Sequence, residues 1–207
     1  MINAVEHTFS LRNKYKTIIT SISNNDEMTS ILYKRASSLD ELNQIKKLQL
    51  QNSPQCIDAQ TKLQEGFVTV QHSVALLEQM NFACAHIVAK DNDYVIGYAL
   101  VMLSRFRNEI VVLIPMFKRI DTLVPKHQSY IVMGQICIAE NYRKQGIFRG
   151  LYQFYKSELG HQYDFLITEL DVTNFRSLRA HQAVGFTIID SYEENGIFWN
   201  IMSWDWT

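Results

Sequence analysis

Residues 130–159, YIVMGQICIAENYRKQGIFRGLYQFYKSEL, carry the clearest fold signal in the chain. The stretch from Tyr130 to Ile138 is almost wholly apolar and predicts a buried strand that contains Gly134. After a short turn, apolar side chains recur at helical spacing from Ile147 to Leu159. The pattern therefore predicts a strand and a helix joined through Arg143-Lys144-Gln145-Gly146.

This junction has the residue types that bind a phosphate. The first turn of a helix leaves backbone N–H groups unpaired and carries the positive end of the helix dipole, so an anion is stabilised there. Arg143 and Lys144 add positive charge, and Gly146 allows a ligand to approach the backbone closely. An ordinary strand-to-helix turn accounts for the same residues equally well, and the segment is neither a P-loop nor a G-x-G-x-x-G motif.

Periodicity and turn residues predict further elements on both sides of this unit. Strands are expected at 31–35, 83–90, 94–103, 165–172, 186–191 and 197–204, and helices at 38–50, 74–80 and 174–184. Residues 91–93 are turn formers, so the strands beside them form a hairpin. The stretch 105–129 is a connection of unusual length, which is either a functional loop or a structural insertion.

Residues 1–28 are interpreted as an N-terminal extension in front of a domain that spans 29–207. Apolar residues such as Phe9, Ile18 and Ile22 are loosely spaced as on a helix, so we expect a helix packed on the domain. An arm that mediates self-association, and with it a homodimer, is the alternative.

Composition excludes several classes of protein. A chain of 207 residues predicts one domain, and 20 Lys and Arg against 21 Asp and Glu provide no basic field for nucleic acid. The three cysteines are widely spaced, which suggests neither a disulfide framework nor a metal site and fits a reducing, cytoplasmic environment. No apolar stretch approaches the roughly 18 residues of a membrane span, so a membrane is not expected as partner. Because the charges balance, a nucleic acid is not expected either.

A second informative stretch is 174–186, NFRSLRAHQAVGF, which follows Glu169-Leu170. Asn174 suits a helix N-cap and Gly185 suits the position just after the helix. Together with Arg143-x-x-Gly146, this stretch resembles the two signatures of the GNAT superfamily, the Gcn5-related N-acetyltransferases. Matching positions of the second signature are Asn174, Ser177, Gly185 and Phe186, and the resemblance covers roughly residues 30–207.

The resemblance implies an α/β (α+β) fold, with a mixed, mostly antiparallel central sheet and helices on both faces. It implies acetyl-CoA as co-substrate and no metal. The cofactor-binding residues carried over from the family are Cys137, Ile138, Arg143, Lys144, Gln145, Gly146, Phe148 and Asn174. Phe148 stands where the family usually has Gly or Ala, so its side chain is expected to turn away from the phosphates.

Two residues are candidates for proton transfer. His181 stands where the family commonly has the Tyr that protonates the departing thiolate; a histidine that only packs the helix is the alternative. Glu169 is the candidate general base, with Glu109 as a rival and a solvated surface charge as the simpler interpretation of either. Cys137 is not expected to act as a nucleophile, because no His or Asp lies at a telling position near it.

The expected function is N-acetyl transfer from acetyl-CoA to a primary amine of a small molecule or peptide, by direct attack in a ternary complex. The alternative is a catalytically silent acyl-CoA-binding or regulatory module, which Phe148 and His181 keep open.

Overall fold

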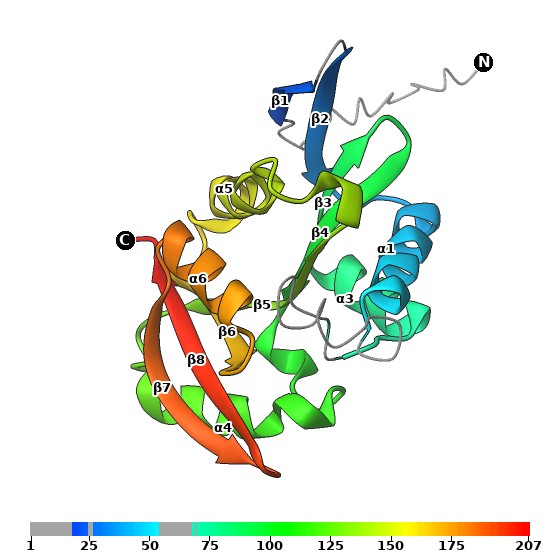
Figure 1. The fold of residues 1–207 in the computed structure, drawn as a ribbon. Helices are drawn as coiled ribbons and strands as arrows, with labels where there is room; N and C mark the ends of the chain where they lie inside the picture. Colours follow the sequence, from blue (N-terminus) through cyan, green and yellow to red (C-terminus); the bar gives the residue numbers. More distant parts are fainter. Residues whose placement is uncertain (1–17, 25–26, 54–67, 69) are drawn as a thin grey trace, which may run out of the picture.

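The computed structural model describes residues 18–24, 27–53, 68 and 70–207. One eight-stranded sheet, in the order β1-β2-β3-β4-β5-β6-β8-β7, runs through this part of the chain (Figure 1). Its strands are β1 Ile18–Asn24, β2 Glu27–Arg35, β3 Ile87–Asp91, β4 Tyr94–Met102, β5 Tyr130–Ile138, β6 Phe165–Asp171, β7 Thr187–Glu194 and β8 Ile197–Asp205. Every neighbouring pair is antiparallel except β5 and β6, which confirms the mixed, mostly antiparallel sheet.

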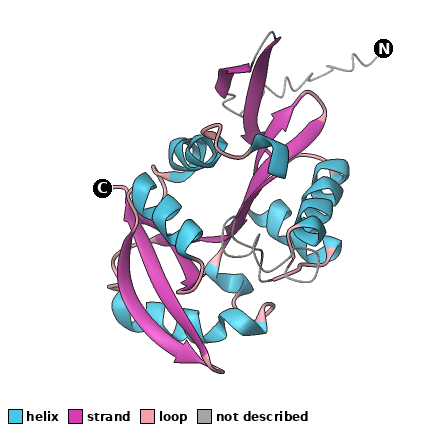
Figure 2. Cartoon of the chain, viewed as in Figure 1, coloured by secondary structure: helices cyan, strands magenta, loops and turns pink. Residues whose placement is uncertain are grey.

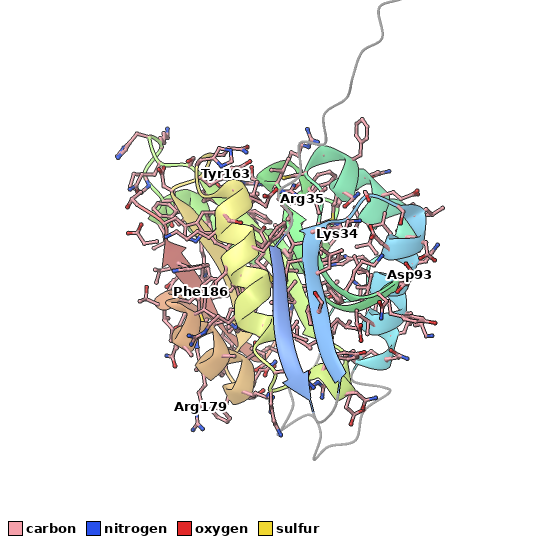
Figure 3. The ribbon with its side chains drawn as sticks, turned by 90° about the horizontal axis from the view of Figure 1, so that it is seen from above. Lys34, Arg35, Asp93, Tyr163, Arg179 and Phe186 are labelled. Carbon is pink, nitrogen blue, oxygen red and sulfur yellow. The ribbon has the colours of Figure 1, made fainter. Side chains whose placement is uncertain are left out.

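Helices cover both faces of the sheet (Figure 2). They are α1 Leu39–Gln51, α3 Val74–Ala83, α4 Ile114–Leu123, α5 Ile147–Leu159 and α6 Phe175–Val184, with short 3-10 turns η1 Ser104–Phe106, η2 Val111–Leu113 and η3 Glu140–Tyr142. Helix α5 packs across β2, β3 and β4 on one face, and α1 lies on the opposite face (Figure 3). The prediction of helices on both faces is therefore confirmed.

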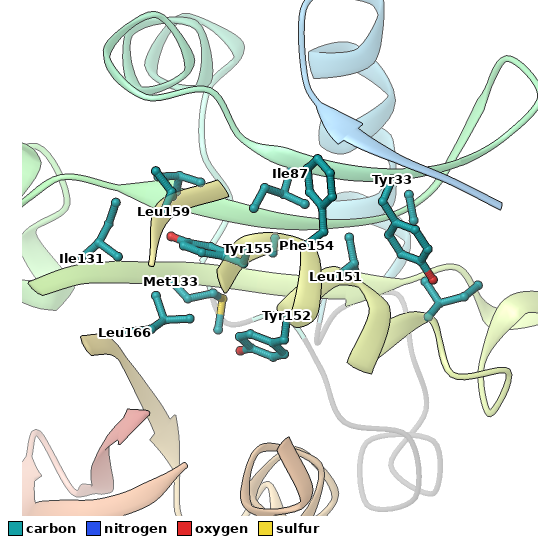
Figure 4. Packing of buried hydrophobic residues seen from close by; sticks show 14 of the residues in the cluster. Tyr33, Ile87, Ile131, Met133, Leu151, Tyr152, Phe154, Tyr155, Leu159 and Leu166 are labelled. Atoms are coloured by element: carbon teal, nitrogen blue, oxygen red, sulfur yellow. The ribbon is translucent and has the colours of Figure 1, made fainter. Parts of the chain in front are cut away.

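The core follows from the alternation of side chains along the strands. On β4, Ala99 and Val101 face the cluster under α5, whereas Tyr98 and Leu100 face the cluster under α1. Helix α5 contributes fully buried aromatic rings to the first cluster, and Figure 4 shows them against residues of β2, β3 and β5. The rigid α5 in turn fixes the position of the turn at its N-terminus.

One expectation about the organisation of the chain is wrong, and one that had two alternatives is made more definite. Residues 18–24 form strand β1, not a helix, because β-branched residues dominate the segment and the edge of β2 is available to pair with it. The connection 105–129 contains α4, since Pro115 lies in the first helical turn, where a missing N–H costs nothing. The predicted boundary between residues 28 and 29 falls within β2. Residues 1–17 lie outside the described residues, so the extent of the N-terminal extension and the self-association arm stay predictions.

Strands β5 and β6 part after three residue pairs, the last of which is Val132 with Ile167. The register between β4 and β5 shifts at the same level, which leaves Gly134 as the extra residue of a bulge in β5. The Thr168 hydroxyl donates a hydrogen bond to the Met133 carbonyl at 3.1 Å, in place of the next ladder bond. Beyond this point the backbones of β5 and β6 diverge and open a groove in the middle of the sheet.

We expect Thr168→Val to lower the free energy of unfolding by about 1–2 kcal/mol, because it keeps the shape of the side chain but leaves the buried Met133 carbonyl without its partner. Urea unfolding followed by circular dichroism measures the loss. Thr168→Ser is the control, since it keeps the hydroxyl; equal losses in both variants would show that the hydrogen bond contributes nothing.

Candidate active site

A cavity of about 310 Å³ lies where β5 leads into α5. Gly146 caps α5 with φ +81°, a left-handed conformation that glycine adopts without strain. A Cβ at this position would meet no atom within 4 Å, so the backbone conformation and not crowding selects glycine. No side chain caps the helix at Gly146, which leaves its first N–H groups available to a ligand.

The wall of this cavity is positively charged. Its lining includes the side chains of Arg143, Lys144, Arg149 and Arg176 and no Asp or Glu of the described residues. Arg143 is held in place, since its Nη2 donates to Asn52 Oδ1 at 2.6 Å and its Nε to the Ile138 carbonyl at 3.3 Å. Gln145 is not part of the lining; its Nε2 donates to the Asn141 carbonyl at 2.9 Å.

Phe148 lines the same cavity from the first turn of α5. Its ring packs edge-on against Tyr152 and His181, with centroid distances of 5.1 Å to each. Aromatic edge-to-face contacts of this kind are favourable. The large side chain at the position of a family Gly or Ala is thus accommodated in an aromatic cluster between α5 and α6.

Cys137 and Ile138 reach the cavity from the end of β5. Cys137 is buried against the α1 side of the sheet, and this burial raises the pKa of its thiol to about 12. The thiol is therefore neutral near pH 7, and thiolate chemistry is not available at this position.

A smaller cavity of about 90 Å³ lies between β5 and β6, where the two strands have parted. It shares Val68, Ile136, Asn174 and Ser177 with the larger one, so the two cavities adjoin and together make up the groove. Asn174 is the N-cap of α6, as predicted, and its side chain accepts from the Ser177 N–H at 3.2 Å. The groove therefore passes across the start of α6.

His181 lines the smaller cavity and is fully buried. Its Nδ1 lies 2.7 Å from the Ser177 carbonyl, which can only accept, so the ring proton is on Nδ1. Nε2 then accepts from the Tyr152 hydroxyl at 2.6 Å. Burial lowers the pKa of His181 to about 4, and the imidazole is neutral at pH 7.

Glu169 lines the same cavity from β6. Burial raises its pKa to about 7, although the Tyr192 hydroxyl donates a hydrogen bond to the carboxylate and opposes the rise. Arg119 of α4 lies over the Tyr192 ring at 4.6 Å and pairs with Asp190 at 2.8 Å. Glu169 is thus held by Tyr192 of β7, and burial places its ionisation near neutral pH.

Tyr192 was not predicted as a site residue, because it comes from β7, two strands away from β6 in the sheet. Only the pairing of both strands with β8 brings Tyr192 beside Glu169.

The structure does not bring Glu109 to the groove, so its proposed place on the acceptor side is wrong. Glu109 is exposed in the turn after η1, where its N–H bonds to the Phe106 carbonyl. Asp121 is paired with Arg107 at 2.6 Å. Asp171 does line the smaller cavity, and its Oδ1 accepts from the backbone and hydroxyl of Thr173.

The described residues lack two other kinds of feature. They contain no group of three or more His, Cys, Asp or Glu placed to hold a metal ion. None of their helices is long and apolar enough to cross a membrane.

Several solved structures share this fold. A chain of the NatC complex bound to Gag peptide and CoA aligns with TM-score 0.60 and 17% identity, over 86% of this chain and 99% of that one. Chaetomium thermophilum Naa20 in complex with a bisubstrate analogue aligns with TM-score 0.60 and 15% identity, over 84% and 85%. Salmonella typhimurium yncA with its cofactor acetyl-CoA aligns with TM-score 0.53 and 13% identity, over 86% and 94%.

Sequence comparison identifies the family. No curated protein matches the chain. The model of the Acetyltransferase (GNAT) family matches residues 53–186, which include β5, α5, β6 and α6 and both motifs at the groove. Because the family model matches more than half of its length and its fold agrees, the chain belongs to the GNAT family of acetyltransferases.

Proposed function

We propose that the protein transfers the acetyl group of acetyl-CoA to a primary amine, by direct attack of the amine on the thioester in a ternary complex. The observation that carries this proposal is the division of charge along the groove. Lys and Arg but no Asp or Glu line the larger cavity, whereas Glu169 and Asp171 but no Lys or Arg line the smaller one, within the described chain.

The larger cavity suits the phosphates of CoA. Arg143 and Lys144 supply charge beside the N-terminus of α5, and the left-handed Gly146 leaves its backbone open to the ligand. The groove then passes Ile136 between the parted strands, where β6 no longer pairs with β5 and the backbone of β5 can bond the pantetheine arm and the thioester carbonyl. The NatC complex is bound to CoA and yncA to its cofactor acetyl-CoA, which supports this assignment.

The smaller cavity suits the amine. An ammonium must lose a proton before it attacks, and a carboxylate whose pKa is about 7 accepts one near neutral pH. Tyr192 holds Glu169 by its hydrogen bond, so the carboxylate keeps a fixed orientation toward the groove. Glu169 therefore acts as general base, directly or through a water molecule.

The hypothesis for His181 is that it protonates the departing thiolate. The Nδ1 proton of His181 is donated to a backbone carbonyl, and Nε2 is an acceptor. This geometry favours the packing interpretation of His181. A catalytically silent module would bind acetyl-CoA without releasing free thiol in the presence of any amine.

Gly146→Glu should weaken acetyl-CoA binding at least about 100-fold in calorimetric titration, because a carboxylate enters the anion site from a strained backbone. Gly196→Glu is a matched control: Gly196 has φ +78°, meets nothing within 4 Å and lies in the β7–β8 turn, away from the groove. An unchanged affinity in the first variant would remove the phosphate site from this turn.

Glu169→Gln should lower kcat by about 10²- to 10⁴-fold and abolish the rise of the rate with pH near 7, since the base must lose its proton to act. The pH profile of CoA release measures both effects. Glu109→Gln is the control and should leave the profile unchanged. If instead the Glu109 variant loses the rise and the Glu169 variant keeps it, the base has been assigned to the wrong carboxylate.

His181→Phe separates its two interpretations. If His181 protonates the thiolate, kcat falls far more than acetyl-CoA affinity; if it only packs, kcat per folded molecule stays within about threefold and Tm falls. From the buried contacts of both ring nitrogens we expect the second result. A large loss of kcat at unchanged Tm would establish the acid role.

A further inference from the structure

We propose that the acceptor is a primary amine with a small apolar substituent and with no carboxylate or other anionic group beside the nitrogen. This inference rests on the proposed function, whose acceptor it assigns to a chemical class. It follows from the lining of the smaller cavity, where three independent features agree.

First, apolar side chains from separate segments line one part of the cavity, beside its polar residues. They are Val68, Val70, Val112, Leu113, Met133 and Trp199. Trp199, which is 8% exposed, offers a large apolar surface from β8, and Val112, 45% exposed, stands at the rim on η2. Transfer of an apolar group from water to such a wall is favourable in proportion to the area that is buried.

Second, the polar side chains of the wall are already paired within the protein. Gln135 Oε1 accepts from Gln49 at 2.9 Å and from the Tyr98 hydroxyl at 2.6 Å, and Gln135 Nε2 donates to the Val70 carbonyl at 2.6 Å. Thr168 and His181 are likewise engaged. A polar substituent that entered this cavity would exchange its bonds to water for few new ones, which is costly.

Third, the charge of the wall selects against anions. Glu169 and Asp171 are the ionisable acids of the lining, and the described residues provide it with no Lys or Arg. A carboxylate beside the acceptor nitrogen would lie close to Glu169, and the described residues of the lining offer it no Lys or Arg as a partner. Since like charges a few ångströms apart in a partly desolvated site repel strongly, free amino acids are excluded as good acceptors.

Leucinamide and leucine are the probes, because they share the amine and the isobutyl group and differ in the charge of the carboxyl end. The third probe is the α-amide of glutamic acid, which differs from leucinamide in having an acidic side chain of similar length in place of the isobutyl group. Acetyl-CoA binding is first measured by calorimetry, and acetyl transfer is then followed by free-thiol release and mass spectrometry. We expect leucinamide to exceed both other amines in kcat/KM by roughly 10- to 100-fold.

Val112→Lys tests the charge rule by introducing a cation at the rim of the cavity. It should narrow the preference for leucinamide over leucine by about tenfold. Val111→Lys is the matched control: Val111 is the neighbouring residue of η2, is 74% exposed and does not line the cavity, so the preference should not change.

The outcomes distinguish a wrong acceptor class from a wrong proposed function. Acetyl-CoA binding with equal use of leucine and leucinamide, or the same effect of both lysine variants, overturns the acceptor class and leaves the cofactor assignment intact. Acetyl-CoA binding without transfer to any probe overturns the acceptor class and, as the behaviour expected of a catalytically silent module, counts against the proposed acetyl transfer as well. Failure to bind acetyl-CoA overturns the proposed function itself, and this inference with it.

Discussion

The parting of β5 and β6 is the constraint on which the rest of the site depends. A parallel pair that continued its ladder to the end of both strands would close the sheet and leave no groove. Three local devices keep the strands apart: the bulge at Gly134, the Thr168 hydroxyl that takes over a ladder bond, and Gln135, which is anchored toward α1. Because the backbone is bonded elsewhere or faces the groove, the open edge is stable without an additional strand.

Charge along this groove differs from the charge of the molecule as a whole. The chain carries almost equal numbers of acidic and basic residues, so no long-range field guides a nucleotide to it. The larger cavity gathers Arg and Lys from the turn before α5, from α5 and from α6, while the carboxylates come from β6. In the proposed ternary complex, short-range contacts thereby draw the anionic co-substrate and the cationic amine to opposite ends of the groove, with the parted strands between them.

Local signals in the sequence predicted the central strand and helix well. Features that depend on contacts between distant segments of the chain were not predicted. β5 and α5 begin and end where the apolar pattern indicates, because each is defined by its own period and by Gly146 between them. Tyr192 beside Glu169, and Asn52 beside Arg143, depend on strand order and helix placement, which no spacing in the chain encodes. Strand β1 was missed for the same reason: its conformation follows from the partner edge of β2.

The two departures from the family pattern, Phe148 and His181, belong to one structural unit. The Phe148 ring lies edge-on to both Tyr152 and His181, and Tyr152 is bonded to the imidazole. The Phe148 ring stands where the family usually has a small residue, and it fills space toward α6. The His181 imidazole fits beside it without an unpaired polar atom, because it accepts from Tyr152 and donates to a backbone carbonyl. A tyrosine at position 181 would have no ring nitrogen to donate to the Ser177 carbonyl, so the imidazole suits the packing around Phe148. The two departures are therefore better explained as one coupled change in packing than as independent losses of function.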